Sequence, residues 1–588
     1  MAAGLAALTA LASAATFGAT AAVADADLPS ADAESAGHGH GLWIDGLGLD
    51  VASTASSSTE FPGAEGPETN GLDLALLQTA TVDADGLTLP LLSDGTNGGL
   101  LALGDLGALS SYSASPSATS SVASSGIITE DGGIDLGPVN DPSSFTPAQL
   151  DASALVRQLL GDEVADELLD EATLSVGALA SRVDAENGAA TSEYSLSGLE
   201  LELSSPAVAG LVDDVDGLAA SLLDPVDALL AEGGSVDALV TGLVGTLNGL
   251  PLVDASVNSI GLDTTPLTGQ LREQLLEEPV ENGDGSVSVD LNDGTITVYL
   301  DQLAISGQPG ETLSTLAPNT DVLSGDTVTA ILNGVSEALV GPGPDSLVTK
   351  ATSLITEGVY GVGLTIDLEV GLSATLPVVG TEIPVAGGSV LIEGTLGGIL
   401  GQAGYDPLGI DTSDVTLLPG LPISVDLGAV LQPVVNAITP VVSSIGAAIL
   451  PVLTTTVADI QPSLVELLQP IVTGLLDEAL EPVLTEVLAV TINEQPEESD
   501  LGAEGFTVRA LSVTLLPLLG DAAVNVQLGS ASAFAEAAAA TLTAAPNPVE
   551  QGGTVTLTGG GFTEGEDVTI TFPDGTTETV TAAAGGAG

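Results

Sequence analysis

The chain has 588 residues, 44% of them hydrophobic, and its 80 Asp and Glu residues stand against five Lys and Arg, for a formal net charge of −75. The hydrophobic content is too high for a wholly disordered chain. The shortage of basic residues argues against binding to nucleic acid or to anionic lipid, because both need clustered Lys and Arg. With no Cys in the chain, disulfides, thiolate metal sites and Cys nucleophiles are excluded.

The first 24 residues are typical of an export signal. Residues 2–23 carry no charge, and the small residues Ala22 and Ala24 precede Asp25 at the spacing of a signal-peptide cleavage site. We therefore expect a signal peptide over residues 1–24 and an extracellular protein at the cell surface or in the cell wall. An apolar membrane anchor over the same residues is the alternative.

Residues 25–146 form a polar region that is broken up by small residues. The runs VASTASSSTE and SSYSASPSATSSVASSG favour loops or flexible segments, with short strands such as residues 86–92 between them. We expect this loop-rich region to lie on the outside of a core that is built from later residues.

Residues 147–536 alternate between strand-like and helix-like patterns, which predicts one large α+β domain whose sheets are covered by Leu- and Val-rich helices. Apolar residues over 207–230 recur at intervals of three, four and seven, as in an amphipathic helix that is kinked at Pro225. Alternating Val, Leu and Ile residues flank Asn292-Asp293-Gly294 and predict a hairpin. We expect a further helix at 325–340 and strands at 193–203, 361–379, 387–400, 506–519 and 522–537.

The stretch from Leu427 to about Leu488 is apolar, and no charged residue lies between Asp426 and Asp459. A membrane span is one interpretation. Six prolines, several Ser and Thr residues and the absence of flanking Lys or Arg favour a buried helical layer instead. Because proline removes a helix hydrogen bond, we expect several short helices, each begun or kinked at a proline.

Residues 537–588 have the character of a small β-module. Val568, Ile570 and Phe572 alternate along one strand, and Asp574-Gly575 predicts a hairpin turn. The stretch PNPVEQGGTVTLTGGGF resembles the start of a bacterial immunoglobulin-like domain. Because such a sandwich takes roughly 100 residues, we expect the module to be truncated here and to continue past Gly588 to a downstream anchor. The alternative is a small three-stranded terminal appendage.

The architecture as a whole resembles the choice-of-anchor G family of bacterial surface proteins. The resemblance covers about residues 30 to 535 and is carried by stretches such as GLGLDVASTASSS and DLGAVLQPVVNAITPVV, together with the export signal and the immunoglobulin-like end. It implies a common body joined to a variable wall or membrane anchor. This chain departs from that pattern, since it contains neither an LPxTG motif nor a terminal apolar helix followed by basic residues.

Two groups of residues are candidate metal ligands. The only histidines, His38 and His40 in GHGHGLWIDG, have a spacing that can bind a divalent metal weakly. Because the segment is rich in glycine, we favour a solvated loop, with Trp43 as an anchor for it. Calcium is the stronger ionic candidate, and its expected oxygen ligands lie in two turn-like motifs: Asp83, Asp85, Asp290, Asn292 and Asp293. Neither motif completes an EF-hand loop, and the second is already explained by the hairpin. We expect no other cofactor.

Catalysis has little support in the sequence. A Ser-His-Asp triad would have to use one of only two histidines. The sequence contains no GxSxG or GxxxxGK[ST] motif. Aromatic residues, which stack on sugars in glycosidases, make up only 2% of the chain. We therefore expect a structural or adhesive surface protein that is not an enzyme. The alternative is an extracellular carrier that holds an apolar ligand in a cavity of the α+β domain.

Overall fold

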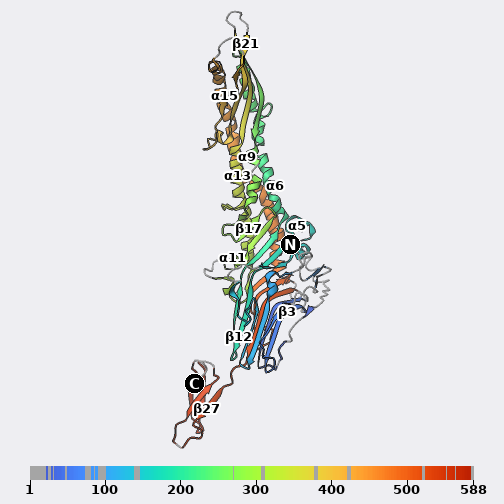
Figure 1. Ribbon diagram of the computed structural model, residues 1–588, viewed down its shortest axis with the longest axis vertical. Coiled ribbons are helices and arrows are strands. Elements are labelled where there is room, and N and C mark those ends of the chain that lie inside the picture. Colours follow the sequence, from blue (N-terminus) through green and yellow to red (C-terminus); the bar gives the residue numbers. More distant parts are fainter. Residues whose placement is uncertain are drawn as a thin grey trace.

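The computed structural model shows an elongated α+β protein in which several antiparallel sheets and long helices succeed one another along one axis (Figure 1). The fold class predicted from the sequence is therefore confirmed. The structure describes residues 22–23, 28–30, 32–46, 49–72, 81–84, 87–90, 101–137, 146–268, 271–305, 311–375, 382–419, 426–518, 523–550, 552–562 and 565–583. The predicted signal peptide lies outside these residues except for strand β1 (Ala22–Val23).

The first large sheet joins the two ends of the body. Its strand order is β1-β3-β2-β26-β25-β24-β19, so that β2 pairs antiparallel with β26 although almost 500 residues separate them. The bounds of the strands after β1 are β2 (Ser35–Gly46), β3 (Leu49–Phe61), β19 (Thr320–Asp321), β24 (Leu488–Glu494), β25 (Phe506–Leu515) and β26 (Val524–Ala535).

The expectation of a loop-rich outer region over residues 25–146 is therefore wrong for the described part of that region. β2 and β3 are 12 and 13 residues long and lie well inside the sheet. Their Ser- and Gly-rich composition suits a strand here because small side chains let a second sheet approach closely. The boundary predicted at residue 146 does not separate two bodies, since β2 and β26 belong to one sheet.

The second sheet packs face to face on the first, through contacts of β9 with β2 and β26 and of β12 with β26. A Cβ atom added at Gly37 of β2 would lie 2.6 Å from the carbonyl oxygen of Val122 on β9, so only glycine permits this approach. The strand order is β13-β12-β9-β8-β4, with bounds β4 (Glu68–Gly71), β8 (Ser110–Ser117), β9 (Ser120–Gly126), β12 (Leu179–Glu186) and β13 (Ala189–Leu196).

A third sheet and its helices follow along the molecule, in the strand order β16-β17-β18-β14-β11-β10-β7. The predicted hairpin is confirmed: Asp290 pairs with Thr295 at the end of β17 and the start of β18. The strands are β7 (Leu101–Ala102), β10 (Ala148–Asp151), β11 (Glu171–Val176), β14 (Leu199–Ser204), β16 (Val280–Glu281), β17 (Val287–Asp290) and β18 (Thr295–Tyr299).

The predicted amphipathic helices are also confirmed. The break near Pro225 separates α6 (Pro206–Ser221) from α7 (Asp224–Leu230), and α12 (Gly325–Val340) has the predicted bounds. The remaining helices of the body are α4 (Ser153–Leu160), α5 (Asp162–Glu167), α8 (Ser235–Asn248), α9 (Thr265–Thr268), α10 (Leu271–Glu277), α11 (Leu300–Ala304), α13 (Leu347–Gly361) and α14 (Leu396–Ile399).

A fourth sheet forms the end of the molecule farthest from the C-terminal module (Figure 1). Its order is β15-β20-β21-β22, with β23 also paired to β21. The two longest strands, β20 (Gly363–Thr375) and β21 (Glu382–Thr395), form an antiparallel pair that points away from the body. The others are β15 (Val253–Asp263), β22 (Gly409–Asp411) and β23 (Thr416–Leu417).

The expectation of several short helices after Leu427 is wrong. One helix, α15 (Leu427–Gly474), runs for 48 residues with five prolines inside it and continues into the π-helical turns η4 (Leu475–Leu480) and η5 (Val483–Val487). Its buried residues, such as Ile445, Ile449 and Leu453, recur every three or four positions, whereas all five prolines are exposed. A proline on the solvent side leaves its unpaired carbonyl in water, and a long helix that curves around a core is convex on that side.

α15 packs along α8, α12 and α13, so the expected helical layer is present. Two helical stretches, Pro206–Asn248 and Leu427–Val487, are nevertheless long and apolar enough to cross a membrane when length and composition alone are considered. The apolar stripe of α15 is used for contacts within the body.

The C-terminal module consists of two hairpins. β27 (Thr541–Ala545) pairs with β28 (Thr556–Gly560), and β29 (Asp567–Thr571) pairs with β30 (Thr577–Thr581). The turn at Asp574-Gly575 is the predicted one, with φ +83° at the glycine. These four strands do not amount to an immunoglobulin-like sandwich, and that assignment stays a prediction.

Candidate functional site

The candidate calcium ligands near residue 290 are part of the hairpin turn. The Asp290 carboxylate accepts a hydrogen bond from the backbone N–H of Asn292 at 2.8 Å, and the Asp293 carboxylate accepts one from the N–H of Thr295 at 3.1 Å. Both carboxylates therefore have a structural role in closing the turn.

The other calcium motif is only partly described. Asp83 lies on strand β5 (Thr81–Ala84), which pairs with β6 (Leu87–Pro90), and Asp85 lies outside the described residues. Within the ranges that the structure describes, no group of three or more His, Asp or Glu side chains is placed to hold a metal ion.

The two histidines are buried in the first sheet, so the expectation of a solvated loop is wrong. His38 and His40 lie on β2 and are 0% and 1% exposed. The physical reason is the alternation in GHGHG: the glycines face the second sheet closely, and the imidazoles lie on the opposite face. The two rings pack edge to face with their centroids 4.4 Å apart, and His40 packs in the same way on Trp43 at 4.5 Å.

A buried ionic network surrounds His40. Asp500, in the connection between β24 and β25, accepts a hydrogen bond from Arg509 at 2.8 Å and lies 3.3 Å from Nε2 of His40. The hydroxyls of Ser530 and Ser532 each donate to the same carboxylate at 3.1 Å. Arg509 also donates to Glu494 at 2.9 Å.

The sheet register brings these residues together. His40 is the cross-strand neighbour of Ser530, Ser530 of Arg509, and Arg509 of Glu494. A row of polar residues thus runs across four strands, and the connection that carries Asp500 supplies the carboxylate for it. We call this group, His38, His40, Glu494, Asp500, Arg509, Ser530 and Ser532, the buried polar cluster.

Burial and charge set the protonation of the buried polar cluster. Burial, helped by neighbouring His40, lowers the pKa of His38 from 6.5 to about 3 and outweighs the opposing effects of Asp500 and the Ser57 backbone, so that His38 is neutral at pH 7. Burial alone would raise the pKa of Asp500, but the hydrogen bond from His40 and the charge of Arg509 hold it well below its usual range. Burial would likewise lower the pKa of Arg509, yet Asp500 and Glu494 keep it raised.

This arrangement is poorly suited to nucleophilic catalysis. In a catalytic triad the imidazole accepts the proton of the serine hydroxyl, and the carboxylate orients the imidazole. Here both serine hydroxyls donate to the carboxylate of Asp500. An adjacent surface groove of about 330 Å³ is lined by Asp500, but its lining residues include neither histidine. The buried polar cluster therefore serves to tie distant parts of the chain together.

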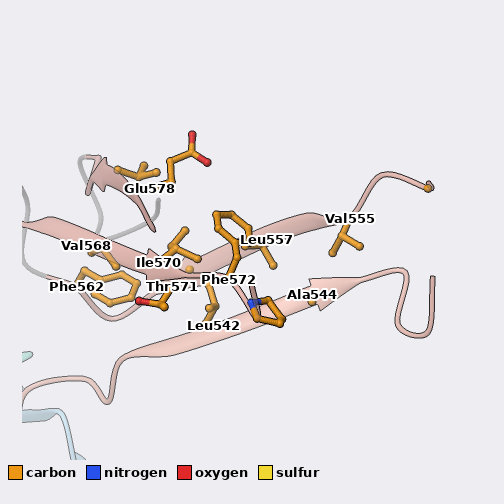
Figure 2. Close-up of a pocket in the computed structure, with 14 residues that line it drawn as sticks. Leu542, Ala544, Val555, Leu557, Phe562, Val568, Ile570, Thr571, Phe572 and Glu578 are labelled. Carbon is orange, nitrogen blue, oxygen red and sulfur yellow. The ribbon is translucent and has the colours of Figure 1, made fainter. Parts of the chain in front are cut away.

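The second candidate is an open apolar cleft between the two hairpins of the C-terminal module. Leu542 and Leu557 of one hairpin and Val568 and Ile570 of the other hairpin line it together (Figure 2). The cleft has a volume of about 760 Å³, and Phe562, Phe572, Val555 and Val580 complete its apolar lining. Leu542 is 54% exposed, so water reaches the inner faces of the strands.

Sequence reasoning found part of these sites. The alternation of Val568, Ile570 and Phe572 was expected to form one apolar face, and all three residues line the cleft. The buried polar cluster was missed. His38 and His40 were singled out, but as weak metal ligands on a solvated loop. A further local signal was Arg509, one of only five basic residues, inside the apolar strand FTVRALSV, because a charge in such a strand needs a buried partner. No local sequence pattern indicates that Asp500 belongs to the buried polar cluster.

Comparison with family models places the body in a family. Residues 17–533 match the model of a domain of unknown function, DUF8394. The chain belongs to this family. The match includes the N-terminal strands, the helices and β24 to β25 as one continuous stretch and does not include the C-terminal module. No curated protein and no solved structure gives a significant match.

Proposed function

We propose that this protein is a non-enzymatic, secreted or cell-surface structural and adhesive protein of a bacterial envelope, in line with the resemblance to the choice-of-anchor G family. The observation that carries the proposal is its shape. The C-terminal module and the β20–β21 pair lie at opposite ends of an elongated body (Figure 1). Such a body suits the task of holding one end away from a surface to which the other end is attached.

The interior of the body favours this role over that of a carrier. One large continuous core of Leu, Val, Ile and Ala side chains runs from the first sheet through the helices to the fourth sheet, and a second, smaller core lies between the first two sheets. Within the described residues, the groove near α13 is open to solvent and bordered by the carboxylates of Asp263 and Glu357. An apolar ligand would need a dry cavity instead.

The charge of the protein fits an exposed location. Eighty acidic residues keep a protein soluble and attract cations, and five basic residues leave few sites for trypsin-like proteases. In this proposal the protein has no nucleic-acid partner, and it is attached to the cell envelope.

Protease treatment of intact producing cells tests the location. We expect proteinase K, added outside the cells, to degrade the protein while a cytoplasmic marker stays intact. Protein that survives on intact cells and is degraded only after lysis would refute the proposal. N-terminal sequencing of the exported form should find Asp25 as the first residue, and retention of Met1 would contradict the predicted signal peptide.

The adhesive role is tested by orientation. Because the chain has no Cys, the exposed residues Glu550 and Glu382 can each be replaced by Cys for single-point coupling to beads. Beads coupled through E550C present the β20–β21 end, and beads coupled through E382C hide it. We expect the first kind to bind intact cells of the producing strain more strongly. Equal binding by both kinds would contradict adhesion through this end.

A further inference from the structure

The C-terminal module has strand edges that no other strand covers. Within the described residues, each of its two sheets contains only two strands, so β27, β28, β29 and β30 each pair on one side only. An isolated two-stranded hairpin is marginally stable in water, and three or more strands with a buried apolar face are needed for independent stability. The cleft between the hairpins is thus apolar surface that further β-structure would cover.

The β27–β28 hairpin lacks the usual protection against pairing with another chain. Exposed edge strands commonly carry Lys, other charges, Pro or a bulge. The sequences of β27 and β28 are TLTAA and TLTGG, with no charge and no proline. All five residues of β27 are exposed. In a chain with 80 acidic residues, this hairpin is an uncharged surface that can accept a strand.

The charge and the position of the C-terminal module indicate which molecule supplies the pairing strand. Residues 537–588 contain six acidic residues and no basic one, and among the acidic residues that the structure describes only Glu578 lines the cleft. The module projects from one end of the body (Figure 1), so most of the −75 charge lies farther away than the Debye length of about 8 Å at physiological salt. A second copy can therefore approach this end without meeting the charge of the body.

We propose that the C-terminal module pairs with the same module of a second copy of the chain. Two β27–β28 hairpins join edge to edge about a two-fold axis, and each then contributes to a four-stranded sheet whose inner face closes the cleft. A two-fold contact of this kind uses the same surface on both chains and is closed, which gives a dimer and not a filament. This inference does not depend on the proposed function.

Sedimentation velocity of the whole 588-residue chain over a range of concentrations tests the pairing. We expect a monomer–dimer equilibrium that shifts toward dimer between about 0.15 and 0.5 M NaCl, because salt screens the remaining repulsion. Because the contact lies at one end of an elongated body, small-angle scattering of the dimer should give a larger maximum dimension than that of the monomer.

Two matched substitutions locate the contact. Leu542→Asp places a carboxylate on the inner face of the β27–β28 hairpin, and Thr558→Asp places one on its outer face, where the side chain is also exposed. Both add one negative charge to the same hairpin. We expect L542D to raise the dimer dissociation constant at least tenfold, whereas T558D raises it by less than about threefold, since an exposed charge is largely screened.

The outcomes that overturn the proposal are distinct. A chain that is monomeric at about 100 μM in 0.5 M NaCl does not pair, and the cleft then has another occupant. A variant that lacks residues 537–588 but still dimerises associates through its body. Equal weakening by L542D and T558D would show that net charge, and not the cleft, controls association.

Discussion

Nε2 of His40 lies 3.3 Å from a carboxylate oxygen of Asp500, although 460 residues separate the two in the chain. His40 belongs to a strand near the N-terminus, and Asp500 belongs to the connection between β24 and β25. The contact therefore joins the first and last parts of the body at one buried point. Its neighbours Arg509, Ser530 and Ser532 complete the hydrogen bonding of the carboxylate.

Loss of Arg509 should destabilise the fold strongly. Arg509→Met leaves the carboxylates of Asp500 and Glu494 without their positive partner, and Asp500 is deeply buried. Breaking a buried ion pair from one side typically costs about 3–5 kcal/mol. Urea unfolding followed by circular dichroism measures this. The control is Arg157→Met, whose closest ion pair, with Asp166, is exposed and whose loss should shift the midpoint little. Equal shifts in the two variants would contradict the assigned role of Arg509.

The buried His38 should make the fold sensitive to acid. Its pKa is about 3 in the folded protein and about 6.5 when unfolded, so between these values only the unfolded chain binds the proton. Its contribution to stability is therefore complete above pH 6.5 and is lost progressively as the pH falls toward 3.

His38→Asn removes this titration. We expect H38N to lose less stability than the wild type between pH 7 and pH 5. Some loss remains in both proteins, because their carboxylates also titrate. Melting temperatures at half-unit pH intervals measure the difference. Parallel curves for the two proteins would show that His38 does not control the acid response.

Salt should stabilise the whole protein. A net charge of −75 opposes the compact state through self-repulsion, and added ions screen it. We expect the melting temperature to rise with NaCl from about 10 to 500 mM, a range over which the Debye length falls severalfold, and to rise more steeply with divalent cations. A flat melting temperature across this range would refute the argument. A saturable response to one calcium ion per chain would instead restore the calcium hypothesis for Asp290 and its neighbours.

Substitutions on the buried face and on the exposed face of α15 should have different effects on the melting temperature. Ile449 is 0% exposed in the core, and truncation of such a side chain to Ala costs about 2–5 kcal/mol. Pro451, two residues later, is exposed, and its replacement by Ala restores a backbone donor for the carbonyl of Ala447. We expect I449A to lower the melting temperature clearly and P451A to leave it unchanged or raise it. A large loss in P451A would show that the proline shapes the helix in a way that the core requires.

The sequence by itself determined the local elements of this protein. The spacing of apolar residues predicted helical structure over residues 207–230 and 325–340, Pro225 predicted the kink near which α6 ends and α7 begins, and alternation around Asn292-Asp293-Gly294 predicted the β17–β18 hairpin. These features depend on residues within about 20 positions of one another, and helix and strand periodicities are local properties of the chain. The extreme charge and the apolar face of Val568, Ile570 and Phe572 were likewise evident from the residues alone.

Only the tertiary structure decided which distant segments meet. The run GHGHG has the period of a strand, but its glycines are required only because Val122 of a second sheet lies close to them. Its histidines are buried only because Asp500 and β26 lie beside them. The prolines of α15 are tolerated because the rest of the body leaves them on the solvent side. Long-range pairing is selected by the summed packing of the whole chain, and no local pattern carries that information.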